Sequence, residues 1–218
     1  MTATAQTLPS LPEEEALRAD LYDFLGALLA APPPAAMLDR CAALTGGDTD
    51  LGRAIDTLAT LAGKTAPKAA EREYNALFIG LGRGELLPFA SYYLTGFLNE
   101  KPLATLRRDM AARRIARAPN RFEPEDNAAS LMEMMAGLIR GRFGAPAPLD
   151  DQATFFNRHL APWAGHFFAD LEGAKGSVLY APVGTIGRLF MEIERDSFRL
   201  GPGTAPTPAG APDRGERP

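Results

Sequence analysis

Two residue types that commonly build metal sites are scarce in this sequence. It contains one cysteine and two histidines among 218 residues. A single cysteine, Cys41, excludes an internal disulfide framework and any zinc site built on cysteine thiolates, and it is expected to be a small buried residue. His159 and His166 are separated by Pro162, and no carboxylate stands at ligand spacing to complete a set. The sequence therefore predicts no metal site and no bound cofactor.

The chain also shows none of the segments that send a protein into or across a membrane. Its start, MTATAQTLPSLPEEEAL, has no basic stretch followed by an apolar one, and no apolar run approaches the roughly 18 residues of a membrane span. The formal net charge is −4 and the pI is near 5.3, which argues against non-specific binding to nucleic acid or to anionic membranes. We therefore expect a cytoplasmic protein with no nucleic-acid partner and no stable membrane insertion.

Helical periodicity, in contrast, runs through most of the chain, and no period-two strand or internal repeat interrupts it. The apolar spacing predicts helices over seven segments: Leu17 to Leu29, Leu51 to Leu61, Tyr74 to Phe78, Leu103 to Met110, Leu131 to Ile139, Phe155 to Leu171 and Ile186 to Ile193. The first should end at APPPA, the second near Gly63 and the third at the glycines of GLGRG. The fourth should begin at Pro102, which occupies a favoured first-turn position.

These segments predict a single all-α domain over residues 11–200. The longest polar connection inside it, RRIARAPNRFEPED, is a plausible hinge over residues 113–126. Residues 1–10 are small and polar, and the tail 201–218, GPGTAPTPAGAPDRGERP, is rich in proline, glycine and alanine. Such segments bury too little surface to fold, so we expect both ends to be disordered.

Evidence for catalysis is weak. GLGRG lacks the lysine of a phosphate-binding loop and follows a helix instead of a strand. Glu123, Glu125 and Asp126 could act as acids or bases, but no nucleophile or partner base accompanies them. Carboxylates in the first turn of a helix, where the spacing predicts these three, are favoured by the helix dipole alone. The chain is therefore not expected to be an enzyme.

Methionines offer a different possibility, since Met132, Met134 and Met135 share one predicted helix and Met110 lies on the preceding one. One interpretation is that they simply fill the core. The other is that they line a groove for variable apolar segments, beside an acidic hinge that suits a ligand with a basic end. Sequence reasoning alone leaves both open.

Four motifs in order resemble the TorD/DmsD/NarJ family of molybdoenzyme chaperones. EREYNALFIG is similar to the family's E-x-x-x-L-F segment, and LPFASYYL to its P-Y-x-S-x-Y segment. EPEDNAASLMEMMAGLI is similar to its E-P-x-D-H hinge and the following helix, and FFNRHLAPWAGHFFADL to its F-x-x-H-L-x-x-W pattern. The resemblance runs from about Leu17 to Phe198. Two departures stand out: Asn127 replaces the hinge histidine, and the second motif is Phe89-Ala90-Ser91-Tyr92-Tyr93.

The resemblance implies an all-helical cytoplasmic chaperone that binds the twin-arginine signal peptide of a molybdoenzyme catalytic subunit and holds back export until the cofactor is loaded. Monomers and homodimers, some of them domain-swapped, are implied as well. The implied peptide site joins three roles. Glu123, Glu125 and Asp126 would face the arginines. Pro124 and Asn127 would order the hinge. The apolar wall would be formed by Tyr74, Phe78, Tyr92, Tyr93 and Met135.

Asparagine at position 127 keeps hydrogen-bonding capacity but has no protonation switch near neutral pH. Two alternative functions remain. One is a chaperone for the core of a cytoplasmic molybdoenzyme, such as a formate dehydrogenase or nitrate reductase, without signal-peptide binding. The other is a small helical nucleotide-binding enzyme, which GLGRG supports poorly.

Overall fold

The computed structural model describes residues 11–80, 83–117 and 123–200. In these residues the chain forms ten α-helices and one π-helical turn: α1 (Glu13–Ala30), α2 (Ala35–Ala42), α3 (Asp50–Ala62), α4 (Pro67–Tyr74), η1 (Asn75–Ile79), α5 (Ala90–Thr95), α6 (Lys101–Ala112), α7 (Ala128–Arg140), α8 (Leu149–His159), α9 (Ala164–Gly173) and α10 (Tyr180–Leu200). The described residues contain no strand, only an isolated bridge between Phe89 and Asn127. The all-α prediction is confirmed.

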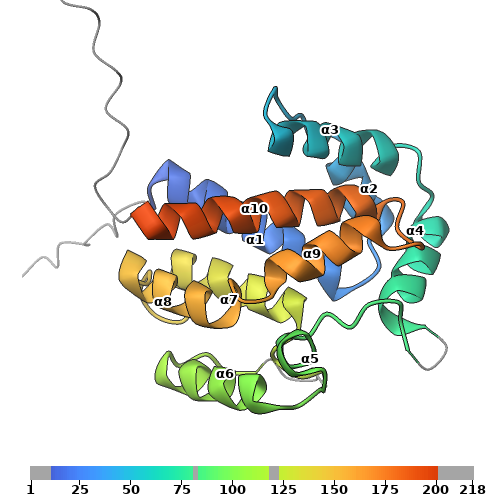
Figure 1. The fold of residues 1–218 in the computed structure, drawn as a ribbon. Helices are drawn as coiled ribbons and strands as arrows, with labels where there is room; N and C mark the ends of the chain where they lie inside the picture. Colours follow the sequence, from blue (N-terminus) through green and yellow to red (C-terminus); the bar gives the residue numbers. More distant parts are fainter. Residues whose placement is uncertain (1–10, 81–82, 118–122, 201–218) are drawn as a thin grey trace, which may run out of the picture.

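The core is built around α1, α7 and the pair formed by α9 and α10 (Figure 1). Ten of the thirteen residues of α7 are buried, so this helix is surrounded by the rest of the fold. Close packing of α10 on α9 depends on a small residue, since a Cβ at Gly187 would lie 2.2 Å from the Phe168 ring. The buried side chains of these helices make one continuous apolar cluster.

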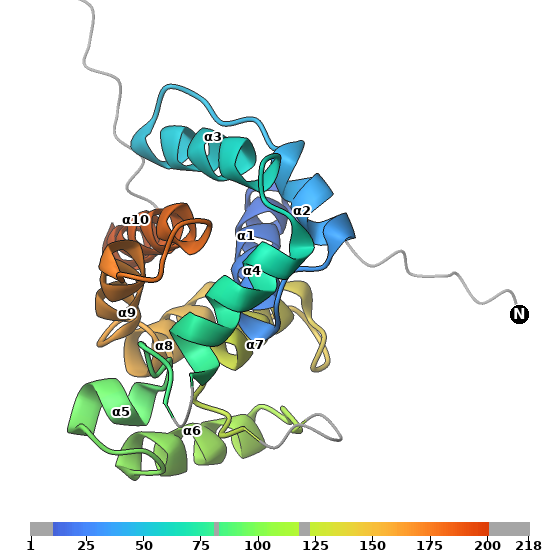
Figure 2. The same cartoon turned by 90° about the vertical axis from the view of Figure 1, so that its right-hand side faces the viewer.

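A second layer, made of α5 and α6, lies below this core in both ribbon views (Figures 1 and 2). On one side, Tyr93 of α5 packs on Trp163, with ring centroids 5.4 Å apart. On the other side, Asp109 of α6 contacts two neighbouring residues of α8: it accepts hydrogen bonds from Arg158 at 2.9 Å and from His159 at 2.7 Å.

Most predicted helices lie where the periodicity indicated, and α3 ends at Gly63 and α6 begins beside Pro102 as expected. Three features differ. The periodicity missed the short helices α2 and α5. The third predicted helix closes with the π-helical turn η1 before Gly80, whose φ of +61° favours glycine.

The third difference concerns the start of α7. This helix begins at Ala128 and has no acidic residue in its first turn, so Glu123, Glu125 and Asp126 precede the helix instead of opening it. The expected disorder at 1–10 and 201–218, residues 81–82 of GLGRG and residues 118–122 of the hinge all fall outside the described residues. Cys41 is buried, as predicted. Among the helices described, none is long and apolar enough to cross a membrane.

Candidate functional site

The segment that leads into α7 is ordered by its own polar groups. The Asn127 amide N–H donates to the Pro124 carbonyl at 3.2 Å, which closes a turn. Asn127 is the N-cap of α7, and its side-chain Oδ1 accepts a hydrogen bond from the Ala129 N–H at 2.9 Å. Such a cap satisfies one of the amides left without a partner at the start of a helix. The Asn127 side chain therefore acts on the hinge backbone.

Asp126 holds α5 against the start of α7. Its Oδ2 accepts from the Ser91 N–H at 2.7 Å, and its backbone carbonyl accepts from the Ala90 N–H at 2.9 Å. The residue is only 1% exposed, and its Oδ1 has no hydrogen-bond partner among the described residues. In this arrangement its charge faces the inside of the fold, so the predicted role of Asp126 in meeting a ligand's arginines is not available at the surface.

Glu125 is already paired. The Arg107 guanidinium donates to its carboxylate at 2.8 and 3.0 Å, and Arg117 approaches it at 3.8 Å. Burial by itself raises the pKa of the Glu125 carboxyl, but the hydrogen bond from Arg107 and the two positive charges lower that pKa below its ordinary value. Glu125 is thus ionised at neutral pH and anchors α6 to the hinge.

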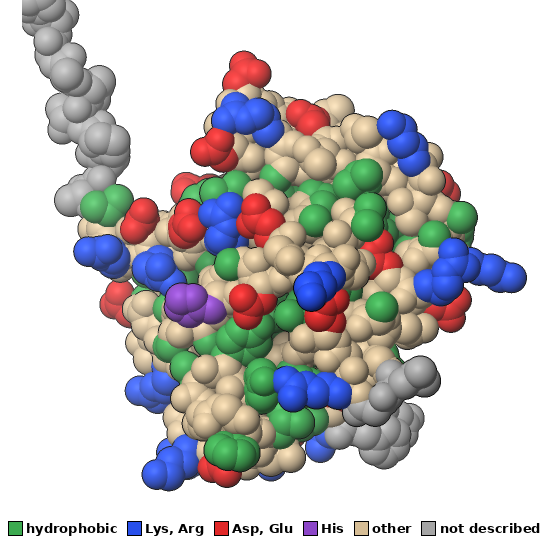
Figure 3. Space-filling view, turned by 45° about the vertical axis from the view of Figure 1, so that its right-hand side comes forward, with side chains coloured by type: hydrophobic (Ala, Val, Ile, Leu, Met, Phe, Trp, Pro, Cys, Tyr) green, Lys and Arg blue, Asp and Glu red, His purple; other side chains and the backbone are tan. Residues whose placement is uncertain are grey.

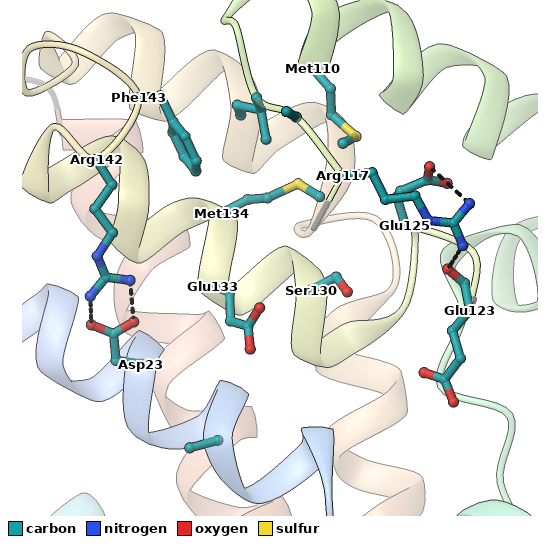
Figure 4. Close-up of a pocket in the computed structure, with 13 residues that line it drawn as sticks. Asp23, Met110, Arg117, Glu123, Glu125, Ser130, Glu133, Met134, Arg142 and Phe143 are labelled. Carbon is teal, nitrogen blue, oxygen red and sulfur yellow. Dashed lines mark hydrogen bonds and ion pairs between the residues drawn. The ribbon is translucent and has the colours of Figure 1, made fainter. Parts of the chain in front are cut away.

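A pocket of about 440 Å³ opens beside this hinge, between α1, the end of α6 and α7 (Figure 4). Its lining residues are Asp23, Ala27, Met110, Ile115, Ala116, Arg117, Glu123, Glu125, Ser130, Glu133, Met134, Arg142 and Phe143. Met110, Met134 and Phe143 lie around one part of it, and the Glu133 side chain points from α7 toward α1 (Figure 4). The floor is apolar and adaptable because two of its side chains are thioethers.

Charged groups border the pocket on both sides. On one side, Arg142 donates to Asp23 at 2.8 Å. On the other side, Arg117 donates to the Glu123 backbone carbonyl at 2.8 Å, while the Glu123 side chain is exposed and has no ion pair with another described residue. Two carboxylates, Glu123 and Glu133, therefore line this apolar depression. Such a site suits a ligand that joins a cationic group to apolar side chains.

The methionines divide between the two interpretations. Met132 and Met135 have no exposed surface and belong to the core, so Met135 cannot form part of a surface wall in this structure. Met110 and Met134, although mostly buried, present their side chains to the pocket. The core interpretation therefore holds for Met132 and Met135, whereas Met110 and Met134 line a pocket and their role in binding stays a prediction.

The predicted aromatic wall is split between two places. Tyr74 and Phe78 pack on each other and on Tyr180 of α10, with ring centroids 5.0 and 5.5 Å apart for the Phe78 pairs. Tyr93 packs on α9 instead, and its hydroxyl donates to Asp170 at 2.9 Å. Tyr92 accepts a hydrogen bond from Arg83 at 2.6 Å. None of these rings lines the pocket, so the structure does not bring the ten predicted residues together.

Sequence reasoning did not predict several residues of the pocket, although their helical spacing could have indicated some of them. Ser130, Glu133 and Met134 follow the i, i+3, i+4 spacing of one helix face. Phe143, three residues after α7, lies over Gly137, where a Cβ would meet the ring at 2.5 Å. Nothing local to the sequence indicates this contact, because it depends on the turn at Gly141 with φ of +72°. Within the described part of the chain, no group of three or more metal-binding side chains gathers.

Comparison with known proteins gives one matching family and three similar proteins. The model of the family described as nitrate reductase delta subunit matches residues 45–169. The proteins named Chaperone protein TorD from three strains of Vibrio cholerae serotype O1 (El Tor Inaba N16961, Classical Ogawa 395 and M66-2) are each 27% identical over 126 residues. These residues make up 55% of this chain and 57% of each relative, so the chain matches little more than half the length of these relatives.

Proposed function

The chain belongs to the nitrate reductase delta subunit family, and on that premise we propose that it is a maturation chaperone for a molybdenum-cofactor oxidoreductase. It binds an N-terminal segment of the client, in the first place a twin-arginine signal peptide, in the cytoplasm. The bound segment is withheld from export until the cofactor has been inserted. The names of the similar proteins from Vibrio cholerae support the chaperone role, and no reaction is assigned to the chain.

The pocket between α1, α6 and α7 is the observation that carries this proposal. Its apolar floor, with Met110 and Met134, accepts apolar side chains of varied shape. Two carboxylates, Glu123 and Glu133, are among its lining residues, and an arginine of a bound peptide would pair with them. An arginine pairs with a carboxylate through two parallel hydrogen bonds, which fixes orientation as well as affinity, whereas a lysine does not.

The three acids at the hinge differ in burial and pairing, which supports different roles for them. Glu125 is neutralised by Arg107 and Arg117, and Asp126 is buried beneath α5. These two acids keep the hinge in shape, and Pro124 and Asn127 do the same through the turn and the cap. Glu123 is the member of the EPED segment that stays available to a ligand.

Isothermal calorimetry with two synthetic peptides tests the proposal. One carries a twin-arginine motif followed by an apolar stretch, and the other has both arginines replaced by lysine. We expect the arginine peptide to bind more tightly, and its affinity to fall as salt rises, because exposed ion pairs are screened over about 8–10 Å. Equal affinity for both peptides at every salt concentration would refute the arginine-capture role.

A matched pair of variants tests the location of the site. Ser130→Lys adds a cation inside the pocket and should weaken binding of the arginine peptide by about tenfold or more, through repulsion and occupied space. Thr60→Lys makes the same change in net charge on the exposed face of α3 and should leave affinity unchanged. If both variants bind the peptide like the parent chain, the pocket is not the site.

A pull-down with a twin-arginine molybdoenzyme and its signal-deleted form separates the proposal from the alternative chaperone function. Loss of binding on deletion supports the signal peptide as the recognised segment. Full retention of the deleted form would instead support recognition of the folded client core.

A further inference from the structure

The segment from Phe97 to Arg117 concentrates positive charge in an acidic protein. It contains six basic residues and two acidic residues, in a chain whose formal net charge is −4. The rest of the molecule is therefore more acidic than the overall value indicates. The net charge alone does not reveal this separation of positive and negative charge. A charged surface that approaches the protein interacts with the local electrostatic potential.

The cations of α6 lie opposite its buried face. Leu103, Leu106 and Met110 point into the fold. Lys101 and Arg108, seven residues apart, occupy the reverse side of the helix, about 10 Å from each other along its axis. The exposed residues between and beyond them on this side include alanines.

Three of the six cations have an acidic partner: Arg107 and Arg117 pair with Glu125, and Arg113 lies 4.0 Å from Asp109. Asp109, the acid within α6, is engaged by Arg158 and His159 of α8. Arg108 bonds to a threonine hydroxyl of its own helix, and the described residues offer no ion pair to Lys101, Arg108 or Arg114. The exposed Glu100 directly precedes Lys101 in the sequence.

An apolar turn adjoins the basic face. Phe97 is 69% exposed, and Leu94 and Leu98 are 43% and 41% exposed. The turn has a defined shape: Gly96 has φ of +81°, and the Thr95 hydroxyl accepts from the Phe97 N–H at 3.2 Å while donating to the Ser91 carbonyl at 2.8 Å. Three large apolar side chains are thus held in water without a covering element.

The two features share one end of the molecule. In both ribbon views α5 and α6 form the lower layer, on the opposite side from α3 (Figures 1 and 2). The space-filling view shows apolar and basic side chains side by side at this lower end (Figure 3). A single flat partner can therefore reach both features.

We propose that α6 and the turn before it dock on the surface of an anionic lipid bilayer. Phe97, Leu94 and Leu98 enter the boundary between headgroups and acyl chains, and Lys101, Arg108 and Arg114 contact lipid phosphates. An acidic polypeptide would pair with the cations but would not account for the exposed apolar turn. An anionic lipid surface accounts for both features, so we favour it over an acidic polypeptide. The negative charge of the remaining faces repels the same surface and so orients the protein with α6 toward it.

This docking places the chaperone at a membrane without inserting a helix in it, and it does not depend on the peptide pocket. It is tested by co-sedimentation of the full chain with vesicles of phosphatidylcholine alone or mixed in equal parts with phosphatidylglycerol. We expect binding to the mixed vesicles only, decreasing with added salt. No binding to the anionic vesicles at low salt would overturn the proposal.

Variants identify the surface that binds. Lys101→Gln combined with Arg108→Gln should weaken binding roughly 25-fold, from about a fivefold loss for each cation near an anionic membrane. Phe97→Ser, at an exposed site, should weaken it without changing the salt dependence. The control, Lys64→Gln combined with Lys68→Gln, makes the same change in net charge in the α3–α4 region and should bind like the parent.

The outcomes are distinct. If the test pair and the control pair lose vesicle binding equally, only net charge matters, and the assignment of the binding surface to α6 would fail. Displacement from vesicles by poly-glutamate, with Phe97→Ser binding like the parent, would assign the basic face to an acidic polypeptide and overturn the lipid proposal.

Discussion

Asn127, the residue that replaces the family's hinge histidine, allows a sharp test of how the start of α7 is stabilised. Its Oδ1 accepts from the Ala129 N–H at 2.9 Å, and both residues are buried. Asn127→Ala removes the cap and leaves a buried donor without an acceptor. The loss of an N-cap costs typically about 1 kcal/mol, and an unsatisfied buried donor about 1–3 kcal/mol. Both values describe the loss of the same hydrogen bond and are not added together, so we expect the free energy of unfolding to fall by about 1–2 kcal/mol.

Urea denaturation followed by far-UV circular dichroism measures this change. The dependence of unfolding free energy on urea should stay constant, because the buried surface is unchanged. Asn127→Ser is the matched control, since serine is also a good N-cap, and it should lose clearly less than the alanine variant. Affinity for the twin-arginine peptide should remain that of the parent in both variants. Unchanged stability of Asn127→Ala together with a large loss of peptide affinity would refute the cap and make Asn127 a peptide contact.

Asn127→His restores the family residue and should make stability depend on pH. A neutral imidazole can accept the Ala129 N–H, but the protonated ring cannot, and its charge faces the positive end of the α7 dipole. Its folded pKa should therefore lie below the ordinary value of about 6.5. Stability would be retained above that pH and lost as pH falls, more steeply than in the parent chain at the same pH values. A parallel pH dependence in variant and parent would contradict this.

Two further predictions concern stability. Glu194 is buried and holds Arg18 through hydrogen bonds of 2.7 Å, so Glu194→Ala should cost roughly 3 kcal/mol in urea denaturation, whereas the exposed Glu192→Ala should cost well under 1 kcal/mol; equal losses would contradict the burial argument. Burial lowers the pKa of His159, although its hydrogen bond to Asp109 acts in the opposite direction. Burial alone would raise the pKa of Asp109, but the hydrogen bonds from His159 and Arg158 outweigh it, so that pKa is lowered as well. In both cases the unfolded chain binds protons first, so parent stability should fall below about pH 6.5 and again below about pH 4; a His159→Gln variant should lose the first decrease and show a smaller second one, because His159 is one cause of the lowered Asp109 pKa.

The family motifs are not all binding residues, which explains part of the difference between prediction and structure. Glu73, the glutamate of the E-x-x-x-L-F segment, accepts the Val178 and Tyr180 amides at 2.7 and 2.8 Å. It thereby orders the start of α10, more than 100 residues away in sequence. Glu85 does the same for Lys175 and Gly176. A motif identifies the family reliably, but whether its residue meets a ligand or a distant amide depends on the fold.

The short helices show where periodicity stops being informative. α5 has six residues, too few for two turns of apolar spacing, and it is held by Asp126 and by the packing of Tyr93 on α9. Hydrogen bonds from outside the helix add to its own, and they matter because a helix of this length is marginal alone. Its position in turn decides that Asp126 is covered, which could not be foreseen from the EPED segment.

The order of residues along the chain was sufficient for the all-helical fold and the methionine-rich helix, because these depend on spacing within one or two helical turns. It was also sufficient to identify the family, through four motifs in order. Tertiary packing alone decided which residues of each set face a ligand. It buried Met135 and exposed Met134 to the pocket, paired Glu125 with Arg107, and left Glu123 at the rim. These outcomes differ because burial and ion pairing are set by neighbours that lie far away in the sequence.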